Sequence, residues 1–422
     1  MPDLTSRRPG FANLTRQQRI DDIKSSLPDL PGDLSSLMDT GAIDPDLVNR
    51  LVENAIGVLP VPLGIATNMQ VDGRDVLVPM ATEESSVIAA VCNAAKRCRA
   101  KGGFYTSYSG SLTIAQVQII GLTNPEAARL TILEHFDEIA ARCAGLDPKL
   151  HEIGGSLKDM EVRVLRGRTG PMVVVHLIVD TVDAMGANAV NTMAEGLAPQ
   201  FEQWTGGTVL LRILSNLADR RLARARAVWK ADDIGGPDTV ERMLIGADLA
   251  EIDPYRATTH NKGIMNGVSA VVLATGNDTR AIEAGAHAFA ARSGQYGPLT
   301  RWERTAEGDL AGSIELPLSL GIVGGATRVH PTAQLCLGIL GTKTAESLAR
   351  VTAAVGLAQN FGALRALATE GIQKGHMALH AQNVAVAAGA TGDEVEKVAQ
   401  SLRASGKINE AAALAELKRL RG

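Results

Sequence analysis

The segment of residues 253–278, DPYRATTHNKGIMNGVSAVVLATGND, joins polar residues to an apolar, glycine-rich run in a way that suits catalysis. A lysine at the edge of a water-poor site can donate to an oxygen that gains negative charge during a reaction. Lys262 directly precedes the apolar run, and the carboxylate of Asp278 at the end of the run can keep such a lysine charged. The same pattern also fits a helix start with a solvated lysine. The polar residues before the apolar run are Arg256, His260, Asn261 and Lys262.

Acid–base candidates elsewhere in the chain are Glu83, Glu84 and His376. The two glutamates precede a predicted helix, where acidic residues stabilise the helix dipole, so simple capping is the alternative to catalysis. His376 lies in the sequence QKGHM at the head of a C-terminal unit, and a histidine that titrates near neutral pH can protonate a leaving group. It can equally be a surface histidine. His380 follows one helical turn later, but no third ligand lies nearby, so we predict no metal site.

The turn of residues 183–188, DAMGAN, connects a predicted strand to a predicted helix through small residues. Free backbone N–H groups at such a helix start can bind a phosphate, although tight strand–helix packing explains the small residues equally well. The pattern is not the G-x-G-x-x-G of a Rossmann fold. Asp147, in GLDPK, is a second cofactor candidate, because a carboxylate beside a ribose accepts its hydroxyls and repels a 2′-phosphate, which favours NADH over NADPH. An isolated Asp at this position is also an ordinary turn residue.

The composition is that of a globular protein of two or three domains, with 422 residues, 45% of them hydrophobic, and a net charge of -4. The chain has no excess of basic residues that would indicate nucleic-acid binding. Its aromatic content of 3% also argues against platforms that stack bases. The cysteines are scattered without a C-x-x-C motif and are expected to be reduced thiols. The polar N-terminus is unlike a signal peptide and no apolar run reaches ~18 residues, so we expect a cytoplasmic protein without a membrane span.

The sequence of the first half of the chain predicts a region of helices with one hairpin, followed by a mixed module of strands and helices. Short helices are expected between residues 15 and 56, then a hairpin over 63–79 that turns at Asp72-Gly73, and then a helix after residue 86. From residue 112 the order becomes strand, helix, strand, strand, helix and strand, which is typical of a ferredoxin-like module inserted into a larger domain. The predicted ranges of this module are 112–121, 124–145, 160–167, 171–181, 183–204 and 208–215.

Beyond residue 216 the chain is expected to return mainly to helices. A hairpin over 299–318 interrupts them, and two amphipathic helices, 391–406 and 409–420, close the chain as a separate unit that is expected to be mobile. The other predicted helices cover 217–229, 238–250, 279–294, 332–341 and 346–372.

Six segments, in order along nearly the whole chain, resemble the motifs of 3-hydroxy-3-methylglutaryl-CoA (HMG-CoA) reductases. The resemblance is closest to the bacterial class II enzymes, which have no membrane domain, and the third and fourth segments are the most specific. The segments are ENAIG (53–57), TEESS (82–86), DAMGAN (183–188), HNKGIMNG (260–267), TGND (275–278) and KGHM (374–377).

The resemblance implies a four-electron reduction of the HMG-CoA thioester to mevalonate by two hydride transfers, or its reverse. Lys262 would stabilise the oxyanion and donate a proton with support from Asp278, Glu84 would act as an acid in the aldehyde step, and His376 would protonate the departing CoA thiolate. The residues implied in binding the HMG group are Ser86, Arg256 and Asn266. The cofactor candidates are Asp147, Asp183, Met185, Gly186, Ala187, Asn188 and Asn216.

The same resemblance implies an α+β fold: a large, mostly helical HMG-CoA-binding domain, an inserted ferredoxin-like (βαββαβ) NAD(H)-binding domain and a C-terminal helical flap. The expected domains are 1–109 with 219–374, then 110–218, and then 375–422. NADH is expected as cofactor, with NADPH less preferred, and no metal is required. The expected small-molecule partners are HMG-CoA or mevalonate with CoA. The chain is also expected to pair with a second copy as an obligate homodimer with an active site between subunits, and a higher assembly of dimers is left open.

Two other readings compete with the reductase. A cofactor-free acyl-CoA lyase or aldolase would use Lys262 to form a Schiff base and would have no use for residues 183–188. A CoA-binding or scaffold protein without catalysis would leave Lys262, Asp278 and His376 free to vary. Both readings explain fewer of the segments at once.

Overall fold

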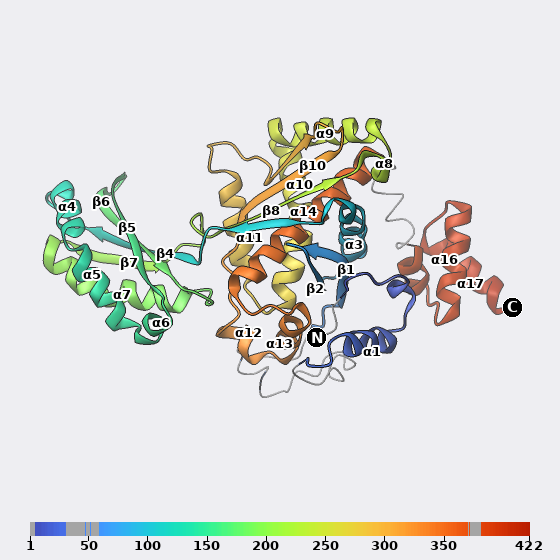
Figure 1. Cartoon of the computed structure of the whole chain (residues 1–422), viewed down its shortest axis with the longest axis horizontal. Helices are drawn as coiled ribbons and strands as arrows, with labels where there is room; N and C mark the ends of the chain where they lie inside the picture. Colours follow the sequence, from blue (N-terminus) through green and yellow to red (C-terminus); the bar gives the residue numbers. More distant parts are fainter. Residues whose placement is uncertain (1–4, 31–46, 48–50, 52–58, 370, 372–380) are drawn as a thin grey trace.

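The computed structural model describes residues 5–30, 47, 51, 59–369, 371 and 381–422. Within them the chain forms a two-stranded hairpin and two four-stranded antiparallel sheets, with helices packed against all three (Figure 1). The segment between residues 112 and 214 gathers at the left of Figure 1, apart from the other two sheets. This mixture of helices and antiparallel sheets confirms the predicted α+β class.

The predicted N-terminal hairpin is present. Its strands, Leu63–Val71 (β1) and Arg74–Ala81 (β2), pair antiparallel, and the turn residues Asp72 and Gly73 have φ angles of 49° and 78°, as a primed turn requires. Of the short helices expected between residues 15 and 56, the described residues include one complete helix. The helices around this hairpin are Phe11–Asn13 (η1), Arg16–Ser26 (α1), Val87–Cys98 (α3) and Arg99–Lys101 (η3).

The second sheet consists of Tyr105–Tyr108 (β3), Leu222–Trp229 (β8), Thr300–Arg304 (β9) and Leu310–Pro317 (β10). The strand order is β3-β8-β10-β9, so strands from distant parts of the sequence lie side by side. The predicted hairpin over 299–318 is confirmed by the pairing of β9 with β10.

The helix predicted over 217–229 is wrong, because most of that segment is strand β8. Its alternating sequence buries Ala223, Ala225, Ala227 and Trp229 on one face and turns the intervening residues away. This is a period of two, which is a strand pattern, but the many Ala and Arg residues favour helices and obscured it. The backbone of β8 pairs with β3 on one side and β10 on the other, and this tertiary pairing decides the conformation.

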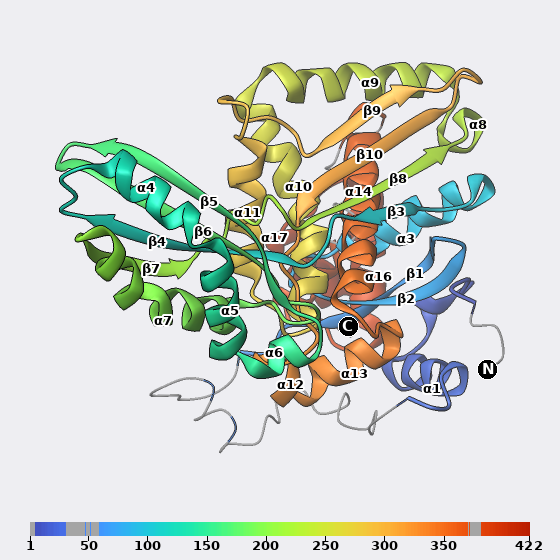
Figure 2. The same ribbon diagram turned by 60° about the vertical axis from the view of Figure 1, so that its left-hand side comes forward.

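Two long helices, Pro254–Ala274 (α10) and Ala345–Ala368 (α14), form the centre of the large body and pack against each other (Figure 2). Glycine permits their close approach, since a Cβ at Gly267 would lie 2.9 Å from Gln359 Cβ. Phe361 of α14 stacks on Trp229, with ring centroids 4.3 Å apart. The other helices of this body are Ala231–Ile234 (α8), Pro237–Ile252 (α9), Thr279–Ala290 (α11), Gly325–Val329 (α12) and Pro331–Leu340 (α13).

The inserted module leaves the large body after β3 and returns before β8, which is the paired neighbour of β3. Its strands are Leu112–Ile120 (β4), Ser156–Gly167 (β5), Gly170–Asp180 (β6) and Thr208–Leu214 (β7), in the order β5-β6-β4-β7. This arrangement confirms the predicted ferredoxin-like module. Its helices are Pro125–Glu134 (α4), Phe136–Leu146 (α5), Pro148–Glu152 (α6) and Ala187–Thr205 (α7).

Two helix boundaries in the module differ from the prediction. The helix expected over 124–145 is interrupted at His135, whose ring stacks on Trp204 with centroids 4.1 Å apart. The helix expected from residue 183 begins only at Ala187. Gly186 has a φ of 101°, which lies outside the right-handed helical region, so the helix does not extend to the residues before it. The residues between β6 and α7 therefore form an irregular connection.

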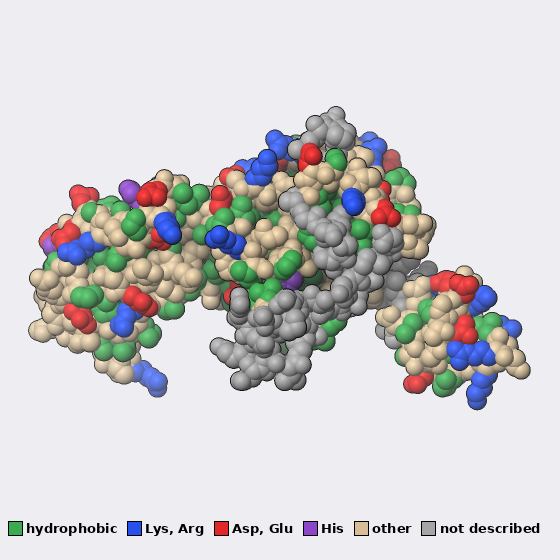
Figure 3. Space-filling model, turned by 90° about the horizontal axis from the view of Figure 1, so that it is seen from below, with side chains coloured by type: hydrophobic (Ala, Val, Ile, Leu, Met, Phe, Trp, Pro, Cys, Tyr) green, Lys and Arg blue, Asp and Glu red, His purple; other side chains and the backbone are tan. Residues whose placement is uncertain are grey.

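Residues 381–387 are helical and pack with Asp393–Ser405 (α16) and Glu410–Arg421 (α17), which confirms the two predicted terminal helices. These helices share a small apolar core of their own, and a second, separate core fills the inserted module. Acidic and basic side chains are interspersed on the face shown in Figure 3. Among the helices that the structure describes, none is both long and apolar enough to cross a bilayer.

Candidate active site

A carboxylate and two polar side chains of α10 meet beside the start of α3. Glu84 Oε2 lies 2.9 Å from Lys262 Nζ and accepts a hydrogen bond from Asn266 Nδ2 at 3.2 Å. Lys262 and Asn266 are one helical turn apart and so lie on the same face of α10. The Lys262 side chain is 62% exposed and that of Glu84 is 35% exposed, so this Glu84–Lys262–Asn266 cluster is open to solvent in the single chain.

Glu84 is directed to α10 by a tight turn between β2 and α3. Its backbone N–H donates to Thr82 Oγ1 at 3.2 Å, and Ser86, the N-cap residue of α3, has a φ of 78°. A positive φ is uncommon for a residue with a Cβ, and such conformations gather at functional sites. The first turn of α3 contains no acidic residue, so Glu84 does not cap that helix.

The other two polar residues before Lys262 lie in the protein interior. His260 is 2% exposed and its Nε2 lies 2.6 Å from Thr300 Oγ1, while Asn261 is fully buried and its Oδ1 accepts from Leu299 N at 3.0 Å. Burial, together with the nearby charge of Arg256, lowers the pKa of His260 to about 3. These two residues fix the rotation of α10 about its axis, and this rotation presents Lys262 and Asn266 to Glu84.

Arg256 lies one turn before His260 and is half-buried. Its guanidinium has no hydrogen-bond or ion-pair partner among the described residues, and burial lowers its pKa. A partly desolvated guanidinium that lacks a carboxylate partner is suited to binding an anionic group of a ligand.

The structure does not bring Asp278 to Lys262. Asp278 is the N-cap of α11, and its Oδ1 accepts from the backbone N–H groups of Arg280 and Ala281 at 3.0 and 3.1 Å. Lys262 lies 12 residues before the last residue of α10, Ala274, which is about 18 Å along the helix axis at ~1.5 Å per residue. In the single chain, Asp278 is therefore well separated from the Glu84–Lys262–Asn266 cluster.

The cofactor candidates of residues 183–188 form the connection between β6 and α7. Asp183 ties this connection to the large body, since its Oδ1 accepts from Ala345 N at 2.8 Å and its backbone oxygen accepts from Ile322 N at 3.0 Å. Val182 has a φ of 51°, which is strained for a β-branched residue. Gly186 is required by packing as well as by φ, because a Cβ there would lie 2.6 Å from Thr181 Cγ2.

The start of α7 has the properties of an anion site. Gly186 provides no side-chain cap to this helix, so the backbone N–H groups of its first turn, which include those of Ala187 and Asn188, are available to a ligand. Met185 and Ala187 are partly exposed and Asn188 is exposed. Asn216, from the loop after β7, is also exposed, and its backbone oxygen would lie 2.6 Å from a Cβ at Gly285 of α11.

Asp147 and Met193 of α7 line a cavity of about 450 Å³ in the inserted module. Asp147 is the N-cap of α6, where its Oδ1 accepts from Leu150 N at 3.0 Å. The lining is largely apolar apart from Asp147, His151 and Ser156. A largely apolar cavity with a carboxylate in its lining is suited to the adenosine part of a nicotinamide dinucleotide.

One buried residue of this region was missed in the sequence. Arg221 is 0% exposed, and its guanidinium donates to Tyr108, Thr181 and the backbone oxygens of Ala184 and Met185. Nothing in the run LADRRLARARAVW distinguishes this arginine from the exposed Arg220 beside it. Only the tertiary structure reveals its burial.

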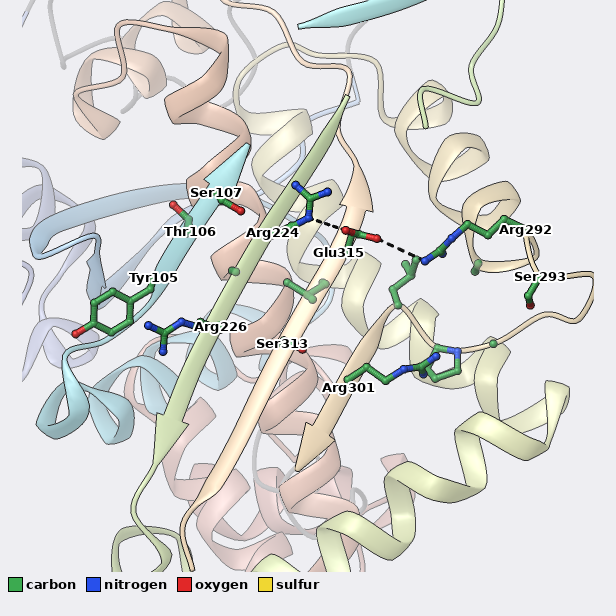
Figure 4. A pocket seen from close by; sticks show the side chains of 16 residues that line it. Tyr105, Thr106, Ser107, Arg224, Arg226, Arg292, Ser293, Arg301, Ser313 and Glu315 are labelled. Atoms are coloured by element: carbon green, nitrogen blue, oxygen red, sulfur yellow. Dashed lines mark hydrogen bonds and ion pairs between the residues drawn. The ribbon is translucent and has the colours of Figure 1, made fainter. Parts of the chain in front are cut away.

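A larger cavity, of about 750 Å³, lies over the outer face of the sheet β3-β8-β10-β9 (Figure 4). Glu315 is at its centre and pairs with Arg224 at 2.6 Å and Arg292 at 3.5 Å, while Arg226 packs on the Tyr105 ring. None of the candidate catalytic, substrate-binding or cofactor-binding residues lines this cavity. Its one carboxylate is held in two ion pairs, so the cavity has no free acid or base for proton transfer.

His376 and the segments of residues 53–57 and 374–377 lie outside the described residues. Among the residues that are described, no group of three or more His, Cys, Asp or Glu side chains is placed to hold a metal ion. The described cysteines are free thiols, and burial raises the pKa of Cys98 and Cys336 to about 12.

Comparison with known proteins connects this geometry to one family. The family model described as hydroxymethylglutaryl-coenzyme A reductase matches residues 15–381. A 3-hydroxy-3-methylglutaryl-coenzyme A reductase of Archaeoglobus fulgidus is 53% identical over 418 residues, which cover 99% of this chain and 95% of that protein. A probable enzyme of the same name from Borreliella burgdorferi is 35% identical and covers 80% of this chain and 78% of that protein.

Solved structures agree with the sequences. A 3-hydroxy-3-methylglutaryl-coenzyme A reductase from Streptococcus pneumoniae superposes with a TM-score of 0.82 at 35% identity, covering 98% of this chain and 99% of that chain. The class II enzyme of the same organism, bound to NADPH in open conformations, superposes with a TM-score of 0.81 at 36% identity, covering 97% of this chain and all of that chain. This chain is therefore a member of the hydroxymethylglutaryl-coenzyme A reductase family, with the fold of its class II enzymes.

Proposed function

We propose that the chain interconverts HMG-CoA and mevalonate plus CoA through mevaldyl-CoA and mevaldehyde, with two hydride transfers from or to NAD(P)H. In the reducing direction, HMG-CoA, two NAD(P)H and two protons become mevalonate, CoA and two NAD(P)⁺. The Glu84–Lys262–Asn266 cluster carries this proposal, because it provides a cation and a carboxyl group 2.9 Å apart on rigid elements. The family motifs around these residues support the assignment.

Lys262 stabilises the oxygen that becomes negative when hydride adds to the thioester carbonyl. One well-placed donor to such an oxygen lowers the barrier by about 3–4 kcal/mol. Glu84 returns a proton to the cluster when the aldehyde is reduced to an alkoxide, and the contacts of its Oε2 with Lys262 and Asn266 support this role. His376 protonates the CoA thiolate that leaves when the mevaldyl-CoA hemithioacetal collapses.

Arg256, Ser86 and Asn266 bind the HMG group in this proposal. The unpartnered, half-buried Arg256 guanidinium supports binding of the free carboxylate of HMG, since guanidinium groups pair with carboxylates through two parallel hydrogen bonds. Ser86 follows Glu84 by two residues, and Asn266 contacts Glu84 directly, so both lie beside the reacting group.

The dinucleotide is bound by the inserted module. When bound, the reduced nicotinamide supplies the hydride for each reduction. The proposed contacts are Asp147 at the adenosine ribose, Met185 to Asn188 at the start of α7, and Asp183 and Asn216 at the junction with the large body. We propose NADH as the preferred cofactor because the Asp147 carboxylate repels a 2′-phosphate. NADPH binding by the Streptococcus pneumoniae enzyme supports a nicotinamide dinucleotide in general.

We also propose that the active chain is a homodimer of three-domain subunits in the cytoplasm. The domains are 1–109 with 219–374, then 110–218, and a flap of 375–422. The separate apolar cores and the pairing of β3 with β8 across the insertion support this division. The apolar side chains on α9 and at the start of α10, which are 48–86% exposed, support a subunit interface: they are Ile245, Leu249, Ile252 and Tyr255. In the dimer, Asp278 supports the charge of Lys262.

The test of the proposed reaction follows absorbance at 340 nm with purified protein, mevalonate and CoA, and with NAD or NADP in separate assays. Reduction of a cofactor that requires both mevalonate and CoA is expected, with NAD faster than NADP. A folded sample that is inactive in this assay and with HMG-CoA plus NADH or NADPH would refute it. Trapping of substrate on Lys262 by borohydride would then favour the lyase.

A further inference from the structure

We propose that Arg221 is a positioning residue for the nicotinamide dinucleotide, which holds the connection between β6 and α7 in the shape that binds the cofactor diphosphate. This inference rests on the proposed function, since the proposed function assigns the dinucleotide to that connection. Arg221 itself lies in the loop before β8, outside the connection that it contacts.

The contacts of Arg221 join the large body to the inserted module. Its Nε donates to Tyr108 Oη at 2.8 Å, and its Nη2 donates to the backbone oxygen of Leu320, both in the large body. Its Nη1 lies 3.1 Å from the backbone oxygen of Ala184 and 3.3 Å from that of Met185. One guanidinium therefore holds two consecutive carbonyl groups of the cofactor connection.

Further hydrogen bonds hold the same two carbonyl groups. Thr113 and Ser319 donate to the Met185 oxygen at 3.2 and 3.3 Å, and Thr181 donates to the Ala184 oxygen at 3.1 Å. These carbonyl groups immediately precede Gly186 and the start of α7. Because both are directed into the buried network, the connection reaches α7 in a fixed shape, and the first-turn N–H groups of α7 have no side-chain cap.

Burying the charged guanidinium of Arg221 costs folding free energy. Its side chain is fully buried, a guanidinium stays charged in proteins, and no carboxylate is among its partners in the described residues. This positive charge lies against the two residues that precede Gly186 and the N-terminus of α7, which has a positive partial charge of its own. Both charges favour an anion at this turn, as the cofactor diphosphate provides.

The experiment compares NADH affinity, measured by NADH fluorescence, for the wild type, Arg221→Lys and the control Arg220→Lys. Arg220 is exposed and pairs with Glu161, so the control makes the same chemical change at the adjacent position. Arg221→Lys retains the charge but loses the forked contacts, and we expect NADH to bind about tenfold more weakly, because small displacements of binding groups are costly. Arg221→Met, which also loses the charge, should bind NADH more weakly still, and its affinity should depend less on salt.

The Kd of HMG-CoA separates a positioning role from a general loss of structure, which would weaken the binding of both ligands. HMG-CoA binds at the Glu84–Lys262–Asn266 cluster, so its Kd should stay within twofold of wild type in Arg221→Lys, while the Kd of NADH rises. Unchanged NADH affinity, or equal losses for both ligands, would overturn the inference. If Arg221→Lys does not fold, Tyr108→Phe removes the hydroxyl that accepts from Arg221 Nε and also lies 3.3 Å from Ser111 Oγ, and it should give a smaller loss of NADH affinity. NADH affinity equal to that of wild type in Tyr108→Phe would overturn the inference. A folded wild type that binds neither NADH nor NADPH would refute the proposed function instead.

Discussion

Lys262 Nζ lies 2.9 Å from Glu84 Oε2 although the two residues are 178 positions apart in the sequence. The contact joins a short turn between β2 and α3 to one face of the central helix α10.

Loss of Lys262 should remove oxyanion stabilisation in both reductions. We expect Lys262→Ala to lower kcat for HMG-CoA and for mevaldehyde by at least about 100-fold, and Glu84→Gln to affect mevaldehyde reduction most. Steady-state kinetics with both substrates measures this, with Lys96→Ala, at an exposed lysine of α3, as control. Activity of Lys262→Ala within a factor of two of wild type would exclude Lys262 from catalysis.

His376→Gln should separate the two half-reactions. Thioester reduction releases CoA and requires a proton for the thiolate, whereas mevaldehyde reduction has no thiolate to protonate. The variant should therefore lose activity with HMG-CoA and retain it with mevaldehyde. Equal losses with both substrates would show that the leaving-group role is wrong.

Asp147→Asn should narrow the preference between cofactors. The change keeps an oxygen that can cap α6 through Leu150 N, but it removes the charge that repels a 2′-phosphate. We expect kcat/KM for NADPH to rise by about tenfold, which is a gain of ~1.4 kcal/mol, with folding unchanged. Asp137→Asn, on the exposed first turn of α5, is the matched control. An unchanged NADH to NADPH ratio would remove Asp147 from cofactor selection.

His260 should make the protein sensitive to acid. Its pKa is about 3 in the folded chain against an ordinary value of 6.5, so between these values the unfolded chain binds a proton that the folded chain excludes. The free energy of unfolding therefore falls as pH drops through this window, by about 2–3 kcal/mol from this residue at pH ~4.5. Urea unfolding at pH ~7 and ~4.5 should show a smaller loss for His260→Gln than for wild type. An equal loss in both proteins would show that His260 is not excluded from protonation.

Hybrid dimers should recover activity if each active site uses both subunits. Lys262→Ala lacks the catalytic cation, and Gly186→Ala places a Cβ 2.6 Å from Thr181 Cγ2 in the cofactor connection. Each variant alone should be inactive. After unfolding and refolding together in equal amounts, half of the dimers are hybrids with one intact site, so roughly a quarter of wild-type activity is expected. No recovery, with dimers confirmed by light scattering, would place both functions in one subunit.

Local patterns in the sequence determined much of this protein. The alternation around Asp72-Gly73 predicted the β1–β2 hairpin, and the order of elements from residue 112 predicted the ferredoxin-like module. The motifs also placed Glu84, Lys262 and Asn266 in one family site, and the structure brings these three side chains together. The hairpin and the module depend on short-range turn chemistry and on periodicity, which can be read within a few residues, whereas the three site residues were implied by the resemblance of whole motifs to the family.

The tertiary structure decided the features that depend on distant partners. β8 is a strand because β3 and β10 pair with it, although its Ala and Arg residues favour a helix. His260 and Lys262 are two residues apart, yet one is buried against Thr300 and the other faces Glu84, because packing fixes the rotation of α10. Arg221 and Arg220 are adjacent, and only the carbonyl groups that the fold gathers around one of them make it a buried anchor. Side-chain type sets what a residue can bind, whereas the packing of distant elements decides what it meets.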